Sequence, residues 1–129
     1  MSNYDTLKQL YKQADSLNEE LPGDVIKKMK LYGQIFELVG KFHASSLADW
    51  KLAEAKRREA LASAYQYGEG TQKEKEARAE IAAAPHRQDE AQKEADCMRW
   101  RNAKDSTQET INILKVQLKD HHEVNKGGA

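Results

Sequence analysis

Cysteine, proline and long apolar runs are scarce in this chain of 129 residues. Cys97 is the only cysteine, so no disulfide can form within the chain, and a reducing compartment is expected. The first ten residues, MSNYDTLKQL, lack the basic start and apolar run of a signal peptide. No apolar stretch is long enough to span a bilayer. These absences predict a cytoplasmic protein that does not enter a membrane.

Net charge is absent as well, because 21 basic residues balance 21 acidic ones. This balance argues against a strongly basic nucleic-acid binder and against an acidic mimic of DNA, although charge can still be uneven locally. Charged residues make up 33% of the chain and hydrophobic residues 39%. That composition is typical of a few helices that each keep a wide polar face. We therefore expect one all-α domain.

The segment YQYGEGTQKE, which starts at Tyr65, combines signals that end one helix and begin another. Gly68 and Gly70 can adopt the left-handed conformation that closes a helix. Thr71, followed three residues later by Glu74, forms a capping box that starts the next helix. Long, glycine-poor patterns run away from this turn in both directions. The sequence therefore predicts a long antiparallel helical hairpin with its tip at residues 68–70.

Three helices are predicted in total. The first covers residues 3–21, where apolar residues recur every three or four positions until Pro22 and Gly23 end it. The second covers residues 24–67, with Asp24 as its N-cap. The third covers residues 71–120, with a kink or short break near Pro85, and is followed by a frayed tail at 121–129. The first helix would complete a three-helix bundle at the base of a coiled-coil stalk.

Apolar seams indicate how these helices pack. The second helix carries one seam at 25, 29, 32, 36 and 39 and another at 31, 35, 38 and 42, so its first half needs two neighbours. Its second half keeps only a narrow seam through Trp50 and Arg57. In the third helix, Ala77, Ile81 and Ala84 are predicted to form the first seam. Gly33 and Gly40 either allow a close backbone approach or cost about 1 kcal/mol each in helix propensity.

The sequence contains no pattern typical of an active site. His43, His86 and Cys97 have no partner at metal-ligand spacing, and no glycine-rich phosphate loop follows a strand. No nucleophile and base can be paired. Carboxylates such as Glu54 stand four residues before a basic residue, here Arg58, which is ordinary stabilisation of a helix surface. We expect no enzymatic activity, no cofactor and no metal.

Two sets of residues are candidates for binding. Tyrosine and arginine are common hot-spot residues of protein interfaces, and they gather near the tip. The candidate protein-binding residues are Arg57, Arg58, Tyr65, Tyr67, Glu69, Lys73 and Arg78. Arginines beside an aromatic residue can also bind phosphates and stack on bases, although interleaved glutamates are equally typical of a solvated helix face. The alternative nucleic-acid set is Arg57, Arg58, Arg78, Arg87, Arg99 and Arg101.

Two segments resemble a diffuse and mostly uncharacterised group of small phage-encoded helical-hairpin proteins. They are WKLAEAKRREALASAYQYGEGTQKEKEARAE, from Trp50 to Glu80, and EADCMRWRNAKDSTQETINILK, from Glu94 to Lys115. Members of the group carry a helix, a Gly-Thr or Gly-Ser tip, and a second helix with an aromatic-basic patch and an apolar end. The resemblance covers roughly the second half of the chain and excludes residues 3–21 and Pro85. It implies an early phage gene that accompanies replication and recombination functions, and it supplies no catalytic residue.

Three interpretations follow. In the first, the chain is a non-enzymatic phage-type adaptor or inhibitor, in the host cytosol, that binds a larger protein of nucleic-acid metabolism or host defence through its stalk and tip. In the second, it is a nucleic-acid-binding protein of a replication or recombination module that uses its arginine rows. In the third, it is a structural coiled-coil protein that self-associates. The second seam of the second helix, at Leu31, Ile35, Leu38 and Phe42, would suit such dimerisation.

Overall fold

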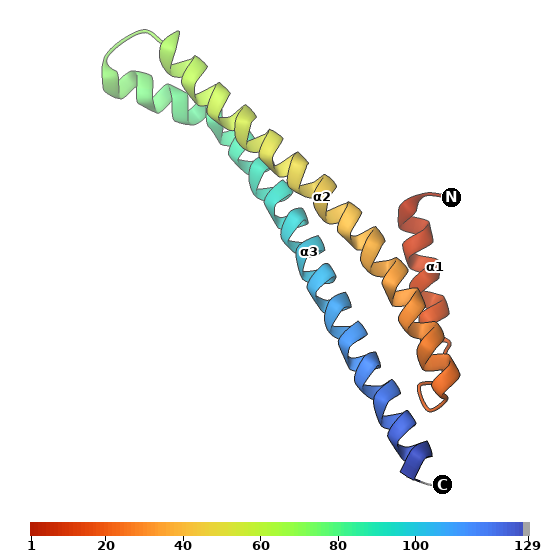
Figure 1. Ribbon diagram of the computed structural model, residues 1–129. Coiled ribbons are helices and arrows are strands. Elements are labelled where there is room, and N and C mark those ends of the chain that lie inside the picture. Colours follow the sequence, from red (N-terminus) through yellow and green to blue (C-terminus); the bar gives the residue numbers. More distant parts are fainter. Residues whose placement is uncertain (128–129) are drawn as a thin grey trace. The chain divides into compact units, whose positions relative to one another are not determined.

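The computed structural model describes residues 1–127, which form three α-helices and no strand (Figure 1). The helices are α1 (Asn3–Asp15), α2 (Pro22–Gln66) and α3 (Gln72–Gly127). The predicted all-α class is confirmed. The chain divides into two compact units. The three-helix unit contains residues 1–42 and 101–127, and the hairpin unit contains residues 43–100.

The three-helix unit buries its apolar residues between α1, the start of α2 and the end of α3. Its fully or almost fully buried side chains are Leu7, Leu10 and Ala14 of α1, Val25, Ile35 and Val39 of α2, and Leu114 of α3. Two edge-to-face ring pairs also join α1 to α2: Tyr4 with Phe42, at 6.5 Å between ring centroids, and Tyr11 with Tyr32, at 6.3 Å. As predicted, α2 has two neighbours here. The α2 seam that contains Ile35 and Phe42 is largely covered, so it does not offer an open face for dimerisation.

α1 ends at Asp15, so the predicted extent of this helix, residues 3–21, is wrong beyond that residue. The Ser16 hydroxyl donates to the carbonyl oxygen of Gln13 at 2.7 Å. Two residues later, the Asn18 side chain accepts from the backbone N–H of Glu20 at 3.0 Å. Serine and asparagine side chains form such local bonds in competition with the helical ladder, which explains the early end of α1.

α2 begins at Pro22, two residues before the predicted start. Proline suits the first helical position because its missing N–H would have no helical partner there. The first turn is closed by the backbone N–H of Val25, which donates to the carbonyl of Leu21 at 3.1 Å. Asp24 is therefore inside the helix, not its N-cap. Its carboxylate instead accepts from the backbone N–H of Asn18 at 3.0 Å and ties the loop to α2.

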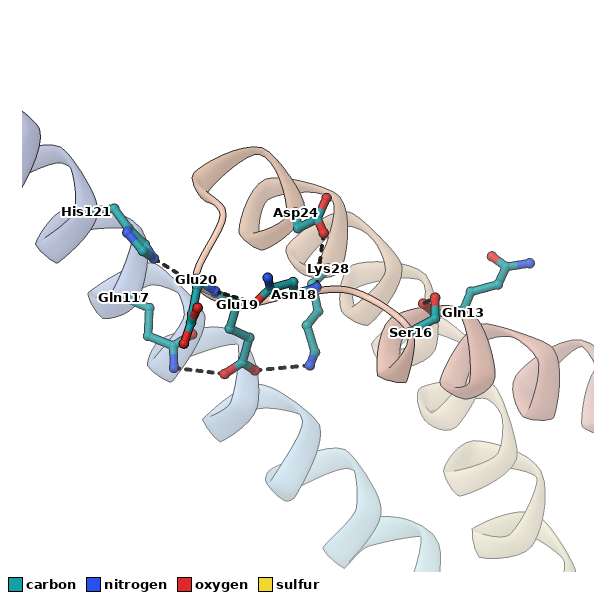
Figure 2. Close-up of polar contacts among 9 residues, drawn as sticks. All are labelled: Gln13, Ser16, Asn18, Glu19, Glu20, Asp24, Lys28, Gln117 and His121. Carbon is teal, nitrogen blue, oxygen red and sulfur yellow. Dashed lines mark hydrogen bonds and ion pairs between the residues drawn. The ribbon is translucent and has the colours of Figure 1, made fainter.

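The loop between α1 and α2 is also tied to α3, through Glu19 (Figure 2). The Glu19 carboxylate accepts from Lys28 Nζ at 3.0 Å and from Gln117 Nε2 at 3.2 Å. The hydrogen bond from Lys28, followed by that from Gln117, lowers the pKa of Glu19. His121 Nε2 lies 2.8 Å from the Glu19 carbonyl, to which it donates. α3 then continues to Gly127, beyond the predicted end at residue 120, and residues 128 and 129 lie outside the described part.

In the hairpin unit, α2 and α3 are joined by the short tip that the sequence predicts. Only Gly70 has a positive φ, at 101°. At Gly68, a Cβ would lie 2.8 Å from the carbonyl oxygen of Ala64, so glycine is required there for space. Thr71 caps α3, because its hydroxyl accepts from the backbone N–H of Glu74 at 3.3 Å. These contacts fix the turn from local sequence alone.

The two helices of the hairpin unit pack along seams with alternating spacings of four and three residues. No residue at 43, 46, 50, 53, 57, 60 or 64 of α2 is exposed, and none at 79, 83, 86, 90, 93, 97 or 100 of α3 is exposed. This spacing keeps one stripe of each helix towards its neighbour. The predicted seam of α3 is wrong: Ile81 is 72% exposed, and Ala77 and Ala84 are exposed, whereas Ala79 and Ala83 are buried.

α3 runs through Pro85 without a break. Figure 1 shows that it bends where its green segment, next to the tip, passes into the teal segment near Pro85. The bend agrees with the loss of one backbone hydrogen bond at a proline inside a helix. Within the three-helix unit, a Cβ at Gly33 or Gly40 would meet nothing within 4 Å. These two glycines therefore permit no close approach and carry only the propensity cost.

Candidate protein-binding surfaces of the hairpin unit

The hairpin unit turns small residues inward. Its buried apolar residues are Ala53, Ala79, Ala83 and Cys97. The charged pair Arg57 and Glu90 also spans the seam, with side chains only 22% and 17% exposed. Alanine buries little apolar area, so the fully buried positions of this seam contribute less hydrophobic stabilisation than the buried leucines and valines of the three-helix unit, and the half-buried Trp50 and Trp100 add to it.

Several larger apolar side chains of the hairpin unit are exposed, whereas Trp50 and Trp100 are half-buried at the seam. The exposed set is Leu47 (37%), Leu52 (57%), Tyr65 (39%), Tyr67 (78%) and Ile81 (72%). Single exposed apolar residues are common on protein surfaces, but here they accompany a seam whose fully buried residues are small. Exposed aromatic and aliphatic side chains are what protein partners bury at interfaces. These exposed side chains are therefore candidates for contact with another macromolecule.

An open groove lies between α2 and α3 on one side of the hairpin. Its volume is about 370 Å³. Leu61, Tyr65 and Ala79 contribute apolar atoms to its lining, and three charged residues contribute polar atoms. The lining residues are Arg58, Leu61, Ala62, Tyr65, Glu76, Ala79 and Glu80. A groove of this size and composition can receive an aliphatic or aromatic side chain of another protein.

The tip brings together a second group of candidate residues. Tyr67, Glu69 and Lys73 are all exposed. Arg78 joins them, because a Cβ at Gly70 would lie only 3.0 Å from Arg78 Nη2. The Arg78 guanidinium also donates from Nε to the carbonyl of Glu74 at 3.4 Å. The tip cluster, defined as Tyr67, Glu69, Lys73 and Arg78, is therefore displayed on a turn with a fixed backbone.

Most of the six candidate arginines of the nucleic-acid set are paired with a carboxylate. Arg58 pairs with Glu54 at 3.0 Å, as its spacing predicts, and Arg99 lies 3.5 Å from Asp96. Arg57 pairs with Glu90 and Arg87 with Glu80. The hydrogen bond between Arg87 and Glu80 lowers the pKa of Glu80 and raises that of Arg87. Arg101, which is exposed, belongs to the three-helix unit.

The structure thus separates the predicted protein-binding residues into three places. Arg58 and Tyr65 line the groove, and Tyr67, Glu69, Lys73 and Arg78 form the tip cluster. Arg57 lies in the seam, and its partner Glu90 was not identified from the sequence. No local spacing links residues so far apart along the chain. Only the register of the two helices, which alanine-rich segments do not define, could have revealed the pair.

Within residues 1–127, no group of three or more His, Cys, Asp or Glu side chains is placed to hold a metal ion. None of the described helices combines the length and the apolarity that a membrane span requires. Comparisons with protein families, with curated proteins and with solved structures find no match to this chain.

Proposed function

We propose that this chain is a non-enzymatic helical adaptor or inhibitor that binds a larger protein through the tip of its hairpin. The tip cluster carries the proposal. Tyr67 is 78% exposed, Lys73 is exposed, and Arg78 Nη2 lies next to Gly70, in and after a turn that Thr71 caps. Aromatic and arginine side chains on a rigid turn lose little conformational entropy on binding.

The pairing of the arginines favours a protein partner over a nucleic acid. Phosphate binding draws its affinity from unpaired positive charge and from the release of counterions. A carboxylate lies close to each of four arginines, Arg57, Arg58, Arg87 and Arg99. These carboxylates reduce the positive electrostatic potential that would attract phosphates. A protein surface can exchange such ion pairs for its own, whereas a phosphate would have to displace the carboxylates.

The class of partner is proposed from the resemblance of the second half of the chain to small phage-encoded hairpin proteins. That resemblance points to a protein of nucleic-acid metabolism or of host defence, encountered in the cytoplasm of the host. A small hairpin whose tip enters a site on such a protein would block it or recruit it without any chemistry of its own.

The proposal is tested by photo-crosslinking in lysate of the host cell. A photoreactive phenylalanine analogue is placed at position 67, at the tip, and separately at Ile81, which is equally exposed on α3. We expect position 67 to give a discrete crosslink to one larger protein that position 81 does not give. The variant Tyr67→Ala/Lys73→Ala should lose capture of that protein at unchanged helicity. Retained capture by this double variant would contradict the proposal.

Fluorescence anisotropy with single- and double-stranded DNA and RNA oligomers tests the alternative function, which is nucleic-acid binding. Binding by phosphate contacts should weaken steeply as salt rises. Tight, salt-sensitive binding that is lost in Arg78→Ala and Arg101→Ala would favour the nucleic-acid interpretation. We expect no such binding at near-physiological salt.

A further inference from the structure

The groove side of α2 carries a stripe of its own next to the seam. Its residues lie one position after the seam residues and repeat the same alternation of four and three: Leu47, Lys51, Glu54, Arg58, Leu61 and Tyr65. Each of them is exposed or half-buried. At about 1.5 Å per residue the stripe is roughly 27 Å long. We name it the flank stripe.

The flank stripe is complementary to the same stripe of a second, antiparallel copy of the chain. Its centre falls midway between Glu54 and Arg58. Rotation about a two-fold axis at that point places Glu54 of one copy opposite Arg58 of the other, and the reverse pair forms by symmetry. The same rotation places Leu47 opposite Tyr65. The remaining positions, Lys51 and Leu61, are compatible because the aliphatic stem of a lysine covers apolar surface, while the Lys51 amine lies 3.6 Å from Glu54 of its own copy.

We propose that the occupant of the groove is a second copy of this chain, bound antiparallel along the flank stripe. Leu47 of each copy would lie beside Tyr65 and Leu61 of the other, in the groove that Ala79 closes from below. The existing pair between Glu54 and Arg58, at 3.0 Å, would become a four-charge network across the two-fold axis. The dimer would cover exposed apolar side chains that the alanine seam leaves outside.

Other faces of α2 do not have this property. In the three-helix unit, the stripe that contains Ile35 is covered by α1, and Ile35 itself has no exposed surface. The opposite side of the hairpin unit is polar except for Leu52, with Lys56, Glu59 and Ser63 beside His86. The tip cluster shares no residue with the flank stripe, so the dimer proposal does not depend on the proposed function.

The test is a charge swap followed by analytical ultracentrifugation of the full chain over a wide range of concentration. Glu54→Arg alone, or Arg58→Glu alone, brings like charges together at the two-fold axis and should weaken the dimer about ten-fold or more. The double variant Glu54→Arg/Arg58→Glu restores opposite charges in both copies. We expect its dimer affinity to return to within about three-fold of the wild type. Circular dichroism checks that the monomer remains helical in each variant.

Matched controls use the polar side of the hairpin. Lys56→Glu and Glu59→Lys change charge by the same amount but lie off the stripe, so the dimer should persist in both. Leu47→Ala should weaken association without any change of charge, and Tyr67→Ala, at the tip, should not. A wild-type chain that stays monomeric at every concentration would overturn the proposal. So would a double variant that dimerises no better than the single variants.

Discussion

At the scale of single residues, two glycines with opposite surroundings should respond in opposite ways to the same substitution. At Gly70, φ is 101°, and a Cβ would overlap the carboxylate of Glu74. Gly70→Ala should therefore lower the free energy of unfolding by about 1–2 kcal/mol. At Gly33, inside α2, a Cβ would meet nothing within 4 Å. Gly33→Ala should raise the free energy of unfolding by about 1 kcal/mol, because alanine is the better helix former.

Urea denaturation followed by circular dichroism measures both glycine effects. Gly40→Ala is the matched control for Gly33, because its Cβ site is equally empty. Stabilisation by Gly70→Ala would show that the tip does not require a positive φ. Destabilisation by both Gly33→Ala and Gly40→Ala would show that these sites are packed after all.

At the scale of the elements, the sequence predicts a helix's packing only where apolar and polar residues contrast. The first seam of α2, through Val25 and Val39, is found from spacing because valine, methionine, tyrosine and phenylalanine recur at helical intervals among polar residues. The start of α3 offers no such contrast. In EARAEIAAAPHR almost every position is alanine or charged, and Ile81, the one large apolar residue, is the exposed one.

The same limit explains which parts of the candidate site could be anticipated. The tip depends on the local signals of Gly70 and Thr71, so its residues could be located from sequence. The groove and the pair between Arg57 and Glu90 depend on the register between two helices. That register follows from the seam through Ala79, Ala83 and Cys97. Their small side chains produce no recognisable apolar periodicity in the sequence. An isolated charged pair in such a seam, such as Arg57 with Glu90, can be identified only from the structure.

The pair between Arg57 and Glu90 yields a prediction for the hairpin as an element. Glu90→Ala leaves the Arg57 guanidinium half-buried without its carboxylate and should lower the free energy of unfolding by about 1–2 kcal/mol. Replacing both residues with leucine should instead leave stability unchanged or raise it by about 1 kcal/mol, because apolar area is buried without desolvation of charge. Thermal or urea unfolding of the two variants measures these changes.

The control for this pair is Arg99→Ala. Arg99 and Asp96 form an ion pair on the surface, where the arginine side chain is 72% exposed. Its loss should change stability by less than about 0.5 kcal/mol. A double leucine variant that is less stable than Glu90→Ala would mean that the seam cannot accommodate larger side chains. The contribution of the charged pair would then be geometric as well as electrostatic.

At the scale of the whole molecule, the two units have interiors of different chemistry although they share α2 and α3. The three-helix unit buries Val25, Ile35, Val39 and Leu114 together with the leucines of α1. The hairpin unit buries alanines, Cys97 and a charged pair. Because the fully buried side chains of the hairpin unit are smaller, we expect its interior to contribute less hydrophobic stabilisation, although Trp50 and Trp100 are half-buried at the same seam. The hairpin unit is therefore expected to open locally while the three-helix unit stays folded.

Amide hydrogen exchange of the full chain measures this difference directly. We expect amides near Val39 and Leu114 to exchange only through global unfolding, and amides near Ala53 and Ala83 to exchange faster, through local opening. Dimerisation along the flank stripe should slow exchange in the hairpin unit as protein concentration rises, whereas Glu54→Arg should remove that dependence. Equal protection of both units at low concentration would contradict the proposed difference. It would mean that the alanine seam holds its two helices together as firmly as the apolar interior does.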